Sequence, residues 1–169
     1  HAAGDRPMET FGLITLAQAL AWTGQTADAR VTAEAAVEIS SSLGGFHEDT
    51  AWVTVANAAL ARGDAVAALE ACHTACRLTY PLKELFTRSL VPMSEASLAC
   101  GDLIGARRWA DDTVAVAPGC HGLLALTARA RVALAQGDFQ RSQSDLYEAL
   151  AVAERTGGRL NLPDAFECL

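Results

Sequence analysis

Apolar residues recur along this chain at helical spacing, in long runs that a short glycine turn interrupts four times. The turns are Thr23-Gly24-Gln25, Arg62-Gly63-Asp64, Cys100-Gly101-Asp102 and Gln136-Gly137-Asp138, and their glycines lie 39, 38 and 36 residues apart. Apolar positions three and four residues apart are typical of amphipathic helices. A glycine that closes a helix can adopt the left-handed conformation that other residues avoid. Each turn is therefore predicted to join two antiparallel helices.

Small residues occupy three fixed positions relative to each of these glycines. They lie seven residues before the glycine and five and twelve residues after it, at Ala17, Ala56, Ser94, Ala130, Ala29, Ala68, Ala106, Ser142, Ala36, Ala75, Thr113 and Ala149. Small side chains allow two helix axes to approach closely, so these positions should face inward. A register kept over a period of this length predicts an all-α solenoid of helical hairpins, coiled as a right-handed superhelix.

The register predicts four hairpin units in a single array. They span about residues 9–42, 47–80, 82–117 and 121–156, and the start of a further helix follows at 160–169. Because that last segment stops before a glycine that would close it, we expect the chain to be a fragment of a longer protein. Pro92 falls inside the first helix of the third unit, which predicts a kink there or a late helix start near Leu90.

Composition and charge narrow the function classes. Of the 169 residues 35 are alanine and only 6% are aromatic, which favours closely packed helices over a sandwich or barrel. The net charge of −7 argues against a broad cationic surface for nucleic acid. No apolar stretch is long enough for a membrane span. The five cysteines are odd in number and lack the spacing of a disulfide scaffold, so a cytoplasmic location is expected.

The small residue before a Gly-Asp turn, the alanines after it and the terminal Pro118 resemble the tetratricopeptide repeat (TPR). The units are longer than the usual length of about 34 residues, and Arg129 stands where a leucine-like residue is common. The closing segment, residues 158–169, resembles the stretch of large actinobacterial LuxR-type regulators in which the repeats run on toward a helix-turn-helix. That resemblance implies a parent protein with an ATPase or cyclase-like domain ahead of the repeats. ATP binding and DNA binding would then lie outside this segment, which has no P-loop motif.

In arrays of this kind the first helices of the hairpins line the ligand-binding face. A polar residue stands six positions before each turn glycine, and an aliphatic residue or threonine stands one turn earlier. These candidate groove residues are Gln18, Asn57, Glu95 and Arg131, with Ile14, Val53, Val91 and Thr127. Amides and arginine can hold a peptide backbone or a carboxylate, while aliphatic side chains supply buried area. The alternative is that the polar residues are ordinary solvent-facing positions.

Several other groups suggest chemistry but have a simpler structural interpretation. Cys72 and Cys76 are one helical turn apart beside His73, yet His73 points about 100° away from Cys72 around the same helix. No fourth ligand is apparent, so we expect core thiols and predict neither a metal nor a cofactor. Asp111 and the adjacent Asp112 are expected on a solvated helix surface. Trp22 and Trp109 are expected to pack between repeats.

The favoured function is a non-catalytic protein-interaction or effector-sensing module of a larger transcriptional regulator. Binding of a protein or peptide partner, or of flanking domains of the parent chain, would be passed on to the ATPase and DNA-binding domains. No direct contact of this segment with nucleic acid or membrane is expected, and exposed array ends predict a homodimer. Two alternatives remain: a structural or oligomerisation spacer, and a thiol-dependent enzyme that uses Cys72 or Cys120.

Overall fold

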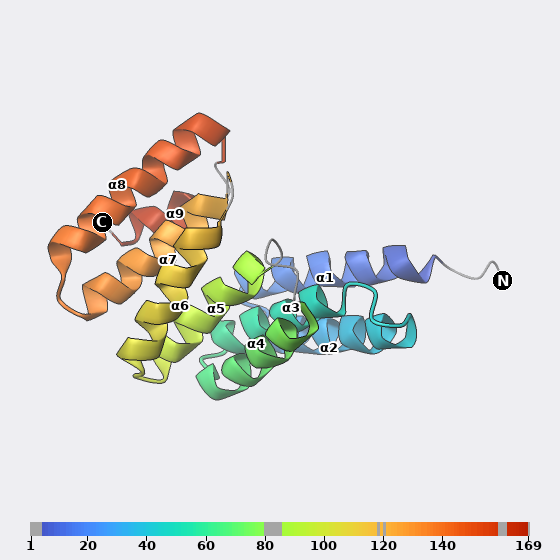
Figure 1. The fold of residues 1–169 in the computed structure, drawn as a ribbon. Coiled ribbons are helices and arrows are strands. Elements are labelled where there is room, and N and C mark those ends of the chain that lie inside the picture. The colour runs from blue at the N-terminus through green and yellow to red at the C-terminus, as the bar shows by residue number, and fades with distance from the viewer. Residues whose placement is uncertain (1–4, 80–85, 118, 120, 159–161, 169) are drawn as a thin grey trace. The chain divides into compact units, whose positions relative to one another are not determined.

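The computed structural model describes residues 5–79, 86–117, 119, 121–158 and 162–168, and all regular elements in these ranges are helices (Figure 1). They are α1 (Arg6–Trp22), α2 (Thr26–Ser42), α3 (Glu48–Ala61), α4 (Ala65–Thr79), α5 (Phe86–Ala99), α6 (Leu103–Val116), α7 (His121–Ala135), α8 (Phe139–Thr156) and α9 (Leu162–Phe166). The predicted all-α class is confirmed. Among the described helices, none combines the length and the apolar character needed to cross a membrane.

The chain divides into two compact units, one on each side of the Pro81–Leu82 junction. Unit 1 is His1–Pro81 and contains the hairpins α1–α2 and α3–α4. Unit 2 is Leu82–Leu169 and contains the hairpins α5–α6 and α7–α8, followed by α9. Within each unit the first helix of one hairpin lies against the first helix of the other, α1 against α3 and α5 against α7.

All four hairpins share one turn geometry. The φ angles of Gly24, Gly63, Gly101 and Gly137 are 78°, 76°, 81° and 76°, in the left-handed region that favours glycine. The amide after each glycine donates to a carbonyl five residues back, as in the 2.9 Å bond from Asp64 to Ala59. This is the Schellman arrangement that ends a helix. Asp64 then accepts from the Ala67 amide at 3.1 Å and so caps the next helix, and Asp102 and Asp138 do the same in unit 2.

The small positions of the register are all buried. The twelve residues named above have exposed fractions between 0% and 3%. Ser94 shows what they do, because its hydroxyl donates to the Ala106 carbonyl at 2.9 Å, from α5 to α6. The small residue seven positions before the glycine thus meets the one five positions after it. Side chains of this size set the close approach of the two helices in a hairpin.

Pro92 does not delay its helix. α5 begins at Phe86 and runs to Ala99 with Pro92 inside it, so the predicted late start near Leu90 is wrong. Proline removes only one backbone hydrogen bond, while Leu90, Met93 and Ala96 on the same helix are buried and hold it in place. The predicted start at residue 82 and the Tyr80-Pro81 break lie outside the described residues.

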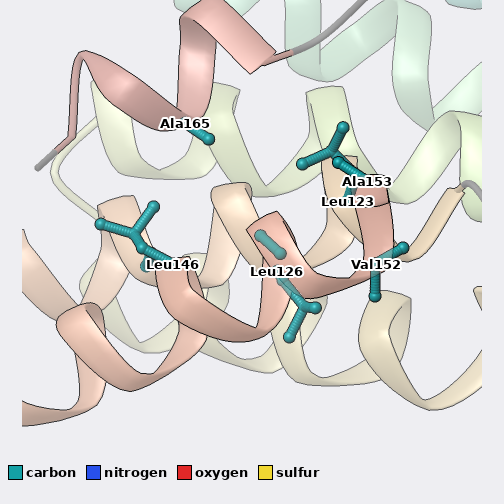
Figure 2. Close-up of a cluster of buried hydrophobic side chains, with 8 residues drawn as sticks. Leu123, Leu126, Leu146, Val152, Ala153 and Ala165 are labelled. Atoms are coloured by element: carbon teal, nitrogen blue, oxygen red, sulfur yellow. The ribbon is translucent and has the colours of Figure 1, made fainter. Parts of the chain in front are cut away.

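An apolar cluster in the described part of unit 2 joins three helices. Leu123 and Leu126 from α7 meet Leu146, Val152 and Ala153 from α8, and Ala165 of α9 packs against the same cluster (Figure 2). Leu162 and Cys168 pack on it as partly buried residues. α9 lies in the segment for which a further helix was predicted, and it covers the last hairpin as the first helix of a following repeat would.

Candidate partner-binding site

The four polar residues of the register divide between the two units. Gln18 of α1 and Asn57 of α3 belong to unit 1, while Glu95 of α5 and Arg131 of α7 belong to unit 2. All four side chains are half-buried. In each unit they lie on two neighbouring first helices, so each pair marks what we call the first-helix face of its unit, Gln18 with Asn57 and Glu95 with Arg131.

In unit 2 the two polar residues bind each other. Arg131 Nη1 donates to Glu95 Oε1 at 2.6 Å, and the two side chains are 30% and 29% exposed. Burial lowers the pKa of Arg131, but the Glu95 carboxylate and the Cys168 thiol outweigh it, so the pKa is raised overall. The guanidinium therefore stays charged and ties α7 to α5. The two opposite charges are therefore paired with each other within the chain.

In unit 1 the two polar residues have no such arrangement. Among the described residues, neither the Gln18 amide nor the Asn57 amide has a hydrogen-bond partner, and both reach solvent. Each amide offers two N–H donors and one carbonyl acceptor. Two amides on adjacent helices can therefore bond to a peptide backbone that lies across α1 and α3.

Three of the four residues in the aliphatic part of the predicted groove are already buried within the chain. Ile14, Val53 and Thr127 are buried, with exposed fractions of 9%, 8% and 3%, and only Val91 is half-buried. Ile14 packs in a core cluster with Ala36 and Ala51. Four positions along a helix turn a side chain about 40° further around the axis. That rotation takes Ile14 away from the solvent and into contact with the neighbouring hairpin, which contributes Ala51.

A buried ion pair, absent from the predicted site, lies between α7 and α8. Arg129 Nε donates to Asp145 Oδ2 at 2.8 Å, and Nη2 donates to Oδ1 at 2.7 Å. The side chains are 15% and 6% exposed. The hydrogen bond to Asp145 is the main cause of the raised pKa of Arg129, and burial opposes it. A bidentate pair of this kind is among the stronger polar contacts in proteins.

Asp111 of α6 connects this pair to two further arginines. It accepts from Arg107 Nε at 2.8 Å and from Arg141 Nη2 at 3.3 Å, and Arg129 Nη1 lies 3.6 Å away. We call Arg107, Asp111, Arg129, Arg141 and Asp145 the ion-pair network. Asp111 was expected on a solvated surface, and its side chain is 41% exposed there while it also takes part in this network. The side of α6 that carries Asp111 faces α7 and α8. Three guanidinium groups, one from each of these three helices, lie within 3.6 Å of its carboxylate.

The sequence contained a signal for this network. Arg129 stands where Leu16, Val55 and Met93 occur in the other hairpins. Asp145, eight residues after its glycine, stands where the second hairpin has Ala71. Two charges of opposite sign that face each other from the two helices of one hairpin are expected to pair when they are buried.

A cleft of about 320 Å³ opens in unit 1 between α2, α3 and α4. Its lining residues are Arg30, Glu34, Val55, Ala59, Arg62, Asp64 and Ala67. Arg30 Nη1 donates to Glu34 Oε1 at 2.6 Å across one turn of α2. Both side chains are about half exposed, at 46% and 51%. The cleft lies at the Gly63 turn and shares no lining residue with the first-helix face of unit 1.

The cysteines of α4 have the surroundings of core thiols. Cys72 is fully buried and Cys76 is half-buried. Burial raises the pKa of the Cys76 thiol, so at neutral pH it is protonated and a poor nucleophile. Cys120 lies outside the described residues. Trp22, which was expected to pack between repeats, is instead 63% exposed.

No family model matches the chain. Proteins named as HTH-type transcriptional regulators in Mycobacterium bovis and Mycobacterium tuberculosis are 38% identical over all 169 residues. The chain spans 19% of the length of these relatives. Two crystal structures of a kinesin light chain protein of Podosopora anserina, with nearly identical TPR-like repeats, superimpose with a TM-score of 0.69. They share 19% identity and cover 97% and 96% of this chain, which itself covers 83% and 82% of theirs.

The chain has a TPR-like helical repeat fold. At this level of identity the structural likeness shows the fold alone, and it confirms the helical-hairpin architecture predicted from the glycine register. A segment of similar sequence therefore occurs within longer proteins that are named as transcriptional regulators.

Proposed function

We propose that this chain is a non-catalytic protein-interaction module of a larger, cytoplasmic transcriptional regulator. The observation that carries the proposal is the 38% identity over every residue of the chain to a segment of HTH-type regulators. The fold supports it, because stacked helical hairpins offer extended surfaces that bind other proteins. The parent would be of the LuxR type, with an ATPase domain ahead of the repeats and DNA binding after them. In effector sensing, binding of a partner or ligand to this module would change the state of the ATPase and DNA-binding domains.

The first-helix face of unit 1 is the contact surface in this proposal. Gln18 and Asn57 have amide groups that reach solvent and no internal partner among the described residues. A peptide segment of a partner, or of a flanking domain of the parent chain, would bond to them through its backbone. Glu95 and Arg131, which already bind each other at 2.6 Å, would keep α5 and α7 in register.

Replacing both amides, Gln18→Ala with Asn57→Ala, should weaken binding of the partner by roughly tenfold, because each lost hydrogen bond contributes about 0.5–1.5 kcal/mol. The probes are the two parts of the parent protein that flank this segment, purified separately and titrated by calorimetry. The matched control is Gln140→Ala with Gln143→Ala, two exposed amides on α8. Equal affinity for the wild type and the double variant, with helicity unchanged in both, would contradict the assignment of this face.

Two alternatives make different predictions in the same experiment. A structural or oligomerisation spacer binds neither flanking part, and it forms a homodimer whose mass sedimentation measures. A thiol-dependent enzyme loses its activity when the native protein is alkylated. The full burial of Cys72 disfavours that thiol as the nucleophile of such an enzyme.

A further inference from the structure

The cleft of unit 1 and the ion-pair network of unit 2 occupy equivalent places in the repeat. Counted from the turn glycines, each residue of the network has a counterpart in unit 1, and four of these five counterparts line the cleft. Arg30 corresponds to Arg107, Glu34 to Asp111, Val55 to Arg129, Ala67 to Arg141 and Ala71 to Asp145. Each place also has an arginine–carboxylate pair one helical turn apart on the second helix of the hairpin before it. Arg30 pairs with Glu34 at 2.6 Å in α2, and Arg107 pairs with Asp111 at 2.8 Å in α6.

The difference between the two places is what fills them. In unit 2 the long side chains of Arg129 and Arg141 reach into the space beside Asp111, at 3.6 Å and 3.3 Å. In unit 1 their counterparts are Val55 and Ala67, which are too short to do so, and a cleft of about 320 Å³ remains. That volume is at the lower end of the range for ligand pockets.

The carboxylates of the cleft have acceptor positions to spare. Asp111 accepts from two guanidinium groups and has a third nearby, whereas Glu34 accepts from Arg30 alone among the described residues. Asp64 uses Oδ1 to cap α4, so its second oxygen is left at the rim. Val55, Ala59 and Ala67 supply the apolar lining of the same cleft. A flexible apolar stem that ends in a planar cation matches this arrangement.

We propose that the cleft between α2, α3 and α4 binds an arginine side chain of a protein partner. The guanidinium bonds to Glu34, as that of Arg141 bonds to Asp111, and its methylene stem lies against Val55, Ala59 and Ala67. Arg62 stands where unit 2 has Gln136 and adds a positive charge at the rim. A single arginine beside an acidic residue therefore fits better than a run of basic residues. This site goes beyond the proposed contact with Gln18 and Asn57 and does not depend on it.

A nuclear magnetic resonance titration of the 169-residue chain with N-acetyl-arginine N-methylamide tests the proposal. We expect saturable shifts of the Val55, Ala59 and Ala67 methyl signals, and none with the neutral citrulline analogue, which has the same shape. Glu34→Gln should lower the affinity for the arginine probe by roughly tenfold or more, since it removes a charged hydrogen-bond acceptor. Glu38→Gln, on the same helix and exposed, should leave binding unchanged.

Ala67→Arg provides a second, independent variant. It gives unit 1 the residue that unit 2 has at the equivalent position, Arg141. Because the new side chain would occupy the cleft, it should abolish the shifts at Val55 and Ala59. The proposal is overturned if the arginine probe gives no saturable shift under conditions that keep the chain folded. It is equally overturned if the citrulline analogue binds as well, or if both Glu34→Gln and Ala67→Arg bind as the wild type does.

Discussion

Arg129→Leu should lower the free energy of unfolding of unit 2 by about 3–5 kcal/mol, although leucine is the residue that α1 carries at the equivalent position. The cost arises because the Asp145 side chain, only 6% exposed, is left buried without its bidentate partner. Urea unfolding followed by the fluorescence of Trp109 measures it, after Trp22 and Trp52 of unit 1 have been replaced by phenylalanine. Trp109 then reports on unit 2 alone.

The control for this prediction is the double variant Arg129→Leu with Asp145→Ala. It gives the fourth hairpin the residue types that the register has at Leu16 and Ala71. An apolar pair that replaces a buried ion pair is often neutral or stabilising, so most of the lost stability should return. If the double variant is as unstable as Arg129→Leu, the cost does not come from an unpaired carboxylate and the role given to this pair is wrong.

Ala17→Leu should destabilise unit 1 by about 1–3 kcal/mol, because a register position has no room for a larger side chain. Ala17 is fully buried. Its counterpart in α5, Ser94, bonds directly to the facing helix at 2.9 Å. Ala19→Leu, two residues along the same helix and exposed, is the matched control and should change stability by no more than about 0.5 kcal/mol. The measurement is the urea midpoint reported by Trp22 and Trp52 fluorescence.

Equal effects of the two leucine substitutions would contradict the register itself. They would mean that the spacing from Gly24 does not select inward-facing positions. A larger cost at Ala17 than at Ala19 is required by the account, whatever its absolute size.

The local structure of the hairpins was predictable because it depends on near neighbours. A glycine such as Gly63 ends a helix through its own backbone conformation, and the aspartate after it caps the next helix within three residues. Small residues at fixed distances from the glycine then identify the inward faces, as the burial of Ala17 and Ser94 shows. These features need no knowledge of the rest of the chain.

The side chains of the candidate site were harder to predict because they depend on neighbouring hairpins. Ile14 is a predicted groove residue by its phase within one helix, whereas contact with the next hairpin buries it in a core cluster. Glu95 and Arg131 were placed at one register position without the recognition that they pair across two hairpins. The contact of Asp111 with Arg141 likewise joins residues 30 positions apart. Helical phase gives the face of a single helix but not what the adjacent helix puts opposite it.

Site-specific photo-crosslinking in the full-length parent protein tests the central claim most directly. A photoreactive phenylalanine at position 57 places the probe on the first-helix face of unit 1, and the same residue at position 38 places it on an exposed surface of α2. The account predicts crosslinks from position 57 to a partner protein or a flanking domain, and none from position 38. Equal yields from both positions, or no crosslink from position 57 while binding persists, would contradict it.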